Sequence, residues 1–166
     1  MSTIDDLKEA FAGESQANRR YLAYAEKAET EGFPGVAKLL RAVAAAETVH
    51  ALNHLKAIGA VGGTVANLTE AMAGEKYEFT EMYPPMLAGA EAEGHKKGAR
   101  SMRFALEVEK VHYDLFGKAL EAVAAGKDLG DVTVHVCPVC GHTVIGPVEG
   151  PCPVCGCRPD LYDDIA

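Results

Sequence analysis

Seven side chains of metal-binding types recur at helical spacing along the first three quarters of the chain. They are Glu14, Glu47, His50, Glu75, Glu78, Glu109 and His112. In each of four segments they interrupt an apolar stripe near its middle, so we expect them to face a helical interior. Five buried, unpaired carboxylates would be untenable without cations. The pattern therefore predicts bound metal ions.

The spacing suggests how the ligands meet. Glu47 with His50, and Glu109 with His112, are Glu-x-x-His pairs, and residues three apart share one face of a helix. One such pair alone is more often a surface ion pair. Two pairs, with carboxylates on both other segments, favour one shared site for two metal ions. Mostly oxygen ligands with two imidazoles suit iron or manganese better than structural zinc.

A second group of candidate ligands lies near the C-terminus. Cys137 and Cys140, then Cys152 and Cys155, form two Cys-x-x-Cys knuckles, which predict one tetrahedral four-thiolate site. Two disulfides are the alternative, which the expected reducing compartment disfavours. Four cysteines alone leave zinc and iron both open. Cys157 is interpreted as a free thiol.

Four helices must position these residues. We expect the first from a Ser2 or Thr3 cap to near Gly32, the second to about Gly59, the third from near Thr69 to Gly94 and the fourth over 95–125. Pro84-Pro85 should interrupt or kink the third. Each half of this set has one Glu-x-x-His, which favours two similar helical hairpins.

The composition divides the chain into two predicted domains. Residues 1–126 should form a mainly α, four-helix bundle, 127–131 a linker, and 132–166 a small four-cysteine domain that begins with a short strand. The small domain is below the size that folds without staples, so a metal would be its core.

Charge excludes several classes of partner. The chain of 166 residues has a net charge of -8 and no basic run, which disfavours nucleic acid and anionic membranes. Its first residues carry neither a basic patch nor an apolar run, and no stretch is long enough to span a membrane. We therefore expect a cytoplasmic protein.

Three motifs carry a family resemblance. The sequence at 11–17 (FAGESQA), the sequence at 73–84 (AGEKYEFTEMYP) and the sequence at 109–112 (EKVH) resemble the rubrerythrins. A Glu from each of two helices plus two Glu-x-x-His pairs is the ferritin-like di-iron pattern, and the extra carboxylate, Glu78, resembles the rubrerythrin variant of it. The resemblance covers essentially the whole chain. It implies a ferritin-like four-helix bundle followed by a rubredoxin-like domain.

The resemblance also implies roles for the ligands. Glu47 and Glu109 would bridge two irons, with Glu14 and Glu75 as terminal ligands and His112 on one iron. The other iron would exchange Glu78 for His50 as its oxidation state changes. By the same resemblance, Tyr21 and Tyr83 would donate hydrogen bonds to ligand carboxylates, although core packing explains them equally well.

Other polar residues are kept out of the predicted site. His54 lies one turn past His50 and is interpreted as a packing residue or as a hydrogen-bond donor to a ligand. Four further glutamates fall off the apolar stripes and should face water: Glu81, Glu91, Glu93 and Glu107.

The implied function is a peroxidase. Hydrogen peroxide would be reduced to water by two electrons from the di-iron pair, and electrons would return one at a time through an iron held by the four cysteines. The implied electron source is a rubredoxin or a separate NAD(P)H-dependent reductase, since the chain has no Gly-x-Gly-x-x-Gly dinucleotide fingerprint.

The same residues allow two other functions, and the helix connection predicts an oligomeric state. A ferritin-like ferroxidase or iron-storage protein would use the same bundle without needing the tail, and a non-enzymatic zinc protein would show no redox transition. The connection between the second and third helices should be taut within one chain. We therefore expect a homodimer, and the taut connection favours helix hairpins exchanged between protomers.

Overall fold

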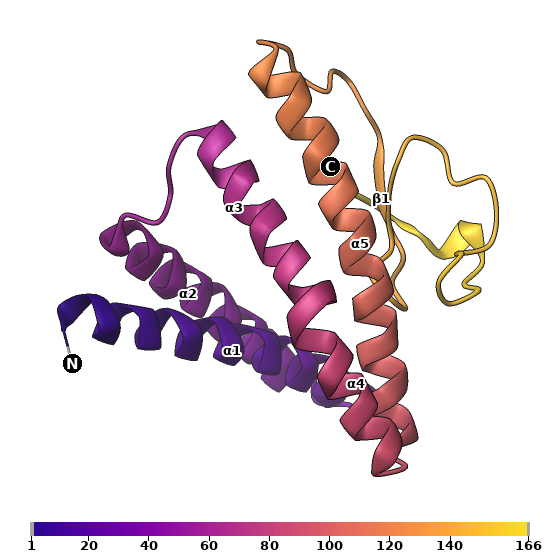
Figure 1. The fold of residues 1–166 in the computed structure, drawn as a ribbon. Coiled ribbons are helices and arrows are strands. Elements are labelled where there is room, and N and C mark those ends of the chain that lie inside the picture. The colour runs from indigo at the N-terminus through magenta and orange to yellow at the C-terminus, as the bar shows by residue number, and fades with distance from the viewer. Residues whose placement is uncertain (1, 166) are drawn as a thin grey trace. The chain divides into compact units, whose positions relative to one another are not determined.

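The computed structural model describes residues 2–165, and the chain falls into two compact units, Met1–Gly62 and Gly63–Ala166. The first unit is a hairpin of two long helices, α1 (Thr3–Thr30) and α2 (Pro34–Ile58), drawn in indigo and purple in Figure 1. Ser2 caps α1 as predicted: its hydroxyl accepts a hydrogen bond from the Asp5 N–H, and the Asp5 carboxylate accepts one from the Ser2 N–H.

Small side chains let α1 and α2 approach closely. Ala25, Ala28 and Ala37 form the buried core of this hairpin, with Leu40 packed against it. One buried polar side chain adds specificity, because the Asn18 amide donates to the Ala44 carbonyl at 2.7 Å and to the Thr48 hydroxyl at 2.8 Å. These bonds fix the register of α1 on α2.

The second unit begins with a helix that is broken in the middle. It runs as α3 (Thr64–Tyr77), the π-helical turn η1 (Glu78–Met82) and α4 (Tyr83–Ala92), and then α5 (Lys96–Ala124) packs against all three. The predicted interruption at Pro84-Pro85 is thus a widened turn just before the prolines. Because Pro84 and Pro85 have no N–H, the carbonyls four residues earlier lose their α-helical donors, and the Tyr83 N–H bonds instead to the Glu78 carbonyl.

One helix boundary differs from the sequence-based expectation. The third helix was expected near Thr69, but α3 begins at Thr64, with Gly63 as its cap. Asn67 and Thr69 resemble turn and capping residues, yet the Asn67 N–H already bonds to the Gly63 carbonyl. The break therefore ends at the glycine pair, and only residues 59–63 connect α2 to α3.

The cysteine-rich end of the second unit is built on a small antiparallel sheet. Its strands are β1 (Val134–Val136), β2 (Thr143–Ile145) and β3 (Asp163–Ile165) in the order β2-β1-β3, with a short 3-10 turn, η2 (Pro159–Leu161), before β3. The predicted strand at 132–136 is confirmed in its last three residues. The predicted domain division at 126 and 131 stays a prediction.

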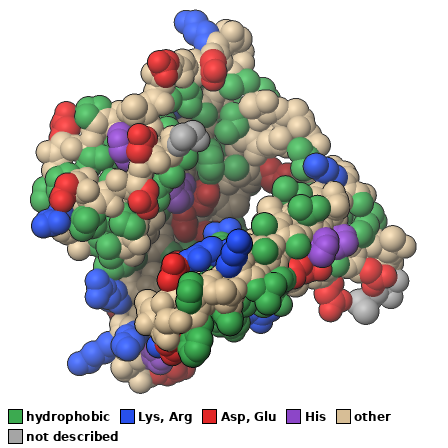
Figure 2. Space-filling model, turned by 180° about the vertical axis from the view of Figure 1, so that it is seen from behind, with side chains coloured by type: hydrophobic (Ala, Val, Ile, Leu, Met, Phe, Trp, Pro, Cys, Tyr) green, Lys and Arg blue, Asp and Glu red, His purple; other side chains and the backbone are tan. Residues whose placement is uncertain are grey.

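Much apolar surface lies open on the helices. Leu39, Val49 and Leu52 on α2 are 64%, 56% and 47% exposed, and Figure 2 shows hydrophobic side chains in green on the surface among charged ones. Surface of this kind is common on subunits that associate. Among residues 2–165, no helix is long and apolar enough to cross a membrane.

The Asn18 contacts give a first test of this fold. Asn18→Ala removes both interhelical hydrogen bonds, and we expect the free energy of unfolding to fall by about 1–3 kcal/mol in a denaturant titration. Asn53→Ala, at an exposed position of α2, is the matched control and should change stability little. Equal stability of the two variants would show that Asn18 does not hold the hairpin together.

Candidate metal centre

The N-terminal unit brings three of the predicted ligands together. Glu14 from α1 and the pair Glu47 and His50 from α2 have ligand atoms within 4.8 Å of one another. His50 Nδ1 lies 2.8 Å from a Glu47 oxygen and 3.8 Å from a Glu14 oxygen. The Glu47 side chain is 14% exposed and the His50 side chain is 53% exposed. This half-site is therefore covered at Glu47 and open to solvent at His50.

The C-terminal unit repeats the arrangement with different helices. Glu75 from α3 and the pair Glu109 and His112 from α5 also have ligand atoms within 4.8 Å of one another. His112 Nδ1 lies 2.8 Å from a Glu109 oxygen. Two helical hairpins of the same chain thus each carry two carboxylates and one imidazole, as the repeated Glu-x-x-His predicts.

The carboxylates of the second half-site repel one another. Burial, and then the charge of Glu109, raises the pKa of Glu75 to about 7. The pKa of Glu78, on the π-helical turn, is raised by the same two causes in the same order. Burial also raises the pKa of Tyr83, and the charges of Glu78, Glu109 and Glu75 add to this effect. Tyr83 and Glu78 therefore share an electrostatic environment with the half-site.

The remaining sequence-based candidates lie as follows. The Tyr21 ring packs near that of Tyr24, with centroids 6.4 Å apart, and its predicted bond to a ligand stays a prediction. His54 is half-buried one turn beyond His50 and is not part of the described three-residue cluster. The glutamates expected to face water are all exposed: Glu81, Glu91, Glu93 and Glu107.

Both half-sites fit a hard metal cation. Each offers oxygen and imidazole ligands at mutual distances that one ion can span, and in the second a cation would offset the burial and the repulsion from Glu109 that raise the pKa of Glu75. The Nδ1 atoms of both histidines face the carboxylates, so the same ring nitrogen would bind metal in each.

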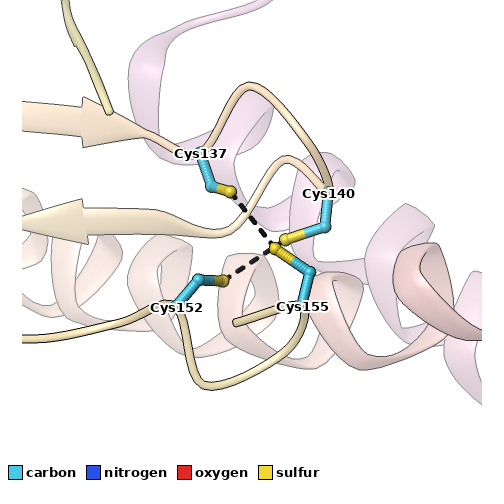
Figure 3. A group of neighbouring side chains, drawn as sticks. All are labelled: Cys137, Cys140, Cys152 and Cys155. Carbon is cyan, nitrogen blue, oxygen red and sulfur yellow. Dashed lines mark hydrogen bonds between the residues drawn. The ribbon is translucent and has the colours of Figure 1, made fainter. Parts of the chain in front are cut away.

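The four predicted cysteine ligands converge in the small domain (Figure 3). The Sγ atoms of Cys137 and Cys155 lie 3.6 Å apart, and those of Cys140 and Cys152 lie 3.5 Å apart. A tetrahedral ion with metal–sulfur bonds of about 2.3 Å requires sulfur–sulfur edges of about 3.8 Å. All four cysteines are free thiols, so the geometry fits a metal site and contradicts the disulfide alternative.

The sequence did not reveal two residues around these sulfurs. Burial alone would raise the pKa of Cys152, but hydrogen bonds from the Tyr162 hydroxyl and from the backbone of Cys155 lower it to about 6. The same hydroxyl lies 3.1 Å from His142 Nδ1. No motif marks Tyr162, because it follows the last cysteine by several residues. Cys157 is a free thiol outside the converging four.

The raised pKa of Glu75 makes metal binding by the second half-site dependent on pH. Below a pKa of about 7 the metal-free carboxyl holds a proton that a cation must displace. Calorimetric titration with Mn²⁺ in buffers of different ionisation heat should show proton release at about pH 6 that disappears by about pH 8.

Two variants make this measurement specific. Glu75→Gln should remove the pH-dependent proton release, whereas Glu70→Gln, at an exposed position of α3, should preserve it. Undiminished proton release in Glu75→Gln would assign the proton to another group.

Comparison with known proteins is consistent with this geometry. The family model described as Rubrerythrin matches residues 5–120. The chain is 36% identical to rubrerythrin-2 of Clostridium acetobutylicum, covering 96% of this chain and 95% of that protein. It is 34% identical to nigerythrin of Nitratidesulfovibrio vulgaris, covering 93% and 82%.

Solved structures agree. The fully reduced, all-ferrous state of nigerythrin aligns with a TM-score of 0.60 at 29% identity, covering 99% of this chain and 87% of that one. A mixed-valence state aligns with a TM-score of 0.59 at 30% identity, with the same coverage. The predicted fold class is confirmed: mainly α, a ferritin-like four-helix bundle followed by a small rubredoxin-like domain. With its paired carboxylate–histidine hairpins and its four-cysteine site, this chain belongs to the rubrerythrin family.

Proposed function

We propose that the protein is a non-haem di-iron peroxidase that reduces hydrogen peroxide to water and receives its electrons through the four-cysteine site. One observation carries the proposal: a single chain holds both the carboxylate–histidine half-sites and a converging set of four thiols. The first kind of site suits two-electron chemistry on an oxygen substrate, and the second suits single-electron transfer. Membership of the rubrerythrin family supports an oxidoreductase with iron at both.

The ligand roles follow the family resemblance. Glu47 and Glu109 would bridge two irons, Glu14 and Glu75 would each bind one, and His112 would hold one of the pair. Glu78 and His50 would alternate on the other iron. The exposure of His50, at 53%, and the position of Glu78 on a π-helical turn leave both side chains room to move.

Bound iron would supply the electrons, and the protein would supply position and protons. Reduction of one hydrogen peroxide to two waters consumes two electrons and two protons. Tyr83 and the protonated form of Glu75 are two groups that would hold protons beside the half-site, because burial and neighbouring carboxylates raise the pKa of both. In the four-cysteine site, zinc would fit the geometry equally well but could not pass electrons.

The electron donor is proposed to be another protein. The chain has no dinucleotide-binding fingerprint, so NAD(P)H would act through a separate reductase or a free rubredoxin. A ferroxidase or iron-storage role would use the same helices, but it does not require the four-cysteine site. A non-enzymatic zinc protein would not account for the two carboxylate–histidine half-sites.

We further propose a homodimer with exchanged hairpins. In a ferritin-like bundle the second and third helices run parallel, so their connection must return along the bundle. His50 lies eight residues before the end of α2 and Glu75 eleven residues after the start of α3. Bringing them level would take a span of about 28 Å at about 1.5 Å per residue. The connection from Ile58 to Thr64 reaches at most about 22 Å.

Because α3 begins at Thr64, earlier than the sequence predicts, its connection to α2 is shorter than expected. A connection that cannot return along the bundle leaves each hairpin to complete its site with the complementary hairpin of a second copy. The exposed apolar residues of α2 are consistent with such pairing.

The peroxidase proposal is tested by rapid mixing of the reduced, iron-loaded protein. We expect hydrogen peroxide to oxidise both kinds of iron site faster than dioxygen does, as followed by visible absorbance. Removing a partner of a metal ligand costs about 10- to 100-fold in affinity or activity, so losing a proposed bridging ligand in Glu109→Gln should cost at least as much.

The matched control is Glu107→Gln, which alters an exposed carboxylate two residues away on α5. It should react like the unmodified protein. Faster oxidation by dioxygen than by peroxide would contradict the peroxidase, and iron uptake far beyond three atoms per chain would favour storage instead.

Hairpin exchange is tested by complementation between two inactive chains. Glu47→Ala and Glu109→Ala each remove one proposed bridging ligand, from α2 and α5 respectively. In an exchanged mixed dimer one site combines both altered hairpins and the other combines both intact ones. Mixed dimers purified through two tags should therefore recover about half of the normal di-iron content and peroxide reduction. Mixed dimers as inactive as either parent would show that each chain completes its own site.

A further inference from the structure

The first cysteine knuckle, residues 137–141, lies against the middle of α5. Val108 is 2% exposed, and its Cγ1 atom lies 3.8 Å from the position that a Cβ atom on Gly141 would take. One turn further along the helix, His112 Nε2 lies 3.0 Å from the hydroxyl oxygen of Thr143 on β2. These contacts hold the knuckle beside the N-terminal half of α5, which it does not cover.

A groove of about 520 Å³ lies between this half of α5 and the knuckle. From α5 it is lined by Lys97, Arg100 and Phe104, which are three or four residues apart and therefore share one face of the helix. The knuckle contributes Val139 and Cys140. The groove thus reaches one of the four proposed thiolate ligands.

The groove is basic although the chain is acidic. Residues 95–106 include four lysines and arginines and no carboxylate, whereas the whole chain has a net charge of -8. Arg103 pairs with Glu91. Among the described residues 2–165, Lys97 and Arg100 form no ion pair. The positive charge of these two exposed side chains is therefore not offset by a neighbouring carboxylate.

Apolar groups lie beside these charges. Val139 is 50% exposed, and the guanidinium carbon of Arg100 lies 5.0 Å from the centre of the Phe104 ring, which is a cation–π distance. Protein-binding surfaces combine apolar contacts with charges at the rim that select the partner. A small anion such as phosphate would use the two cations and leave Val139 in water. The mixed character of the groove therefore favours a protein.

We propose that this groove is the docking surface for an acidic electron-carrier protein, which delivers electrons to the four-cysteine site at Cys140. The inference rests on the proposed function and adds where the donor binds and which charge it carries. One electron leaves the redox centre of the carrier, which is oxidised, and one reaches the four-cysteine iron, which goes from ferric to ferrous. Complementary charge steers the two proteins together, because transient electron-transfer complexes bury little surface and depend on long-range attraction.

The first measurement is binding without electron transfer. Full-length protein loaded with Zn²⁺ is titrated in a calorimeter with a purified rubredoxin of net negative charge that also holds Zn²⁺ in place of iron. We expect binding at low salt that weakens as salt is added, because salt screens charges at the surface. Absence of binding at low salt would overturn the proposal.

Two double variants with the same net charge make this measurement specific. Lys97→Glu with Arg100→Glu should weaken binding by about tenfold or more, since it reverses the charge of the groove. Lys118→Glu with Lys127→Glu, at exposed positions towards and beyond the other end of α5, should bind like the unmodified protein. Equal affinities of the two double variants would show that net charge, and not this groove, attracts the rubredoxin.

A second pair of variants tests the apolar part of the groove. Val139→Asp should weaken binding of the same rubredoxin by about tenfold or more, through like-charge repulsion and lost apolar contact. Leu161→Asp introduces the same group at a residue of the same domain that is 46% exposed and does not line the groove, and it should leave binding unchanged. Normal binding by Val139→Asp would overturn the groove as the docking site.

The second measurement follows the electron. Iron-loaded, oxidised protein is mixed rapidly with the reduced iron form of the rubredoxin, and the visible absorbance of the ferric four-cysteine site is followed as it bleaches. At low salt the Lys97→Glu, Arg100→Glu variant should bleach about tenfold more slowly or worse, and at high salt its rate should approach that of the unmodified protein. Equal rates at low salt would overturn the docking surface.

These experiments separate the docking surface from the peroxidase. No peroxide is used, and the Zn²⁺ titration involves no redox step, so failure to bind the rubredoxin would overturn the surface and leave the result with peroxide unaffected. A parallel titration with inorganic phosphate tests the simpler occupant. Binding of phosphate that depends on Lys97 and Arg100, without binding of the rubredoxin, would make the groove a small-anion site and overturn the proposal.

Discussion

The cost of placing several carboxylates in one partly buried space is the constraint on which the rest of this structure depends. In the second unit burial, and then the charge of Glu109, raises the pKa of Glu75 to about 7, and the same two causes raise the pKa of Glu78. Such a cluster costs stability until positive charge reaches it. The polar stripes of these helices therefore cost stability as packing surfaces, and bound cations would offset that cost.

The same constraint explains why each hairpin looks incomplete by itself. The buried core of the first is made of alanines, its larger apolar residues stay exposed, and its cluster is covered on one side only. Under the proposed exchange of hairpins, both the ligands and the exposed apolar residues of this unit would meet their counterparts on a second copy. A pair of ions with ligands from four helices would then join the formation of the site to the pairing of hairpins, and metal binding and assembly would become one equilibrium.

Motifs with a short, repeated spacing could be predicted from the sequence. The Glu-x-x-His pairs, the cysteine knuckles, the Ser2 cap and the glycine that ends α2 each have a local physical signature, and the structure gathers the cysteines and places the cap and the helix end as predicted. Sequence reasoning could not place Thr143 against His112, because that contact joins residues 31 positions apart through a docking of domains that no local pattern encodes. It also missed the π-helical turn and the start of α3 at Thr64, where the bonding of neighbouring backbone groups overrides residue preference.

The burial of Val108 beneath Gly141 ties the folding of the two domains to each other. A domain of this size would need a bound ion in order to fold alone, so a chain without metal would lose the packing of Gly141 over Val108. Loading the thiols would come first and would shape the helix that later binds the other irons.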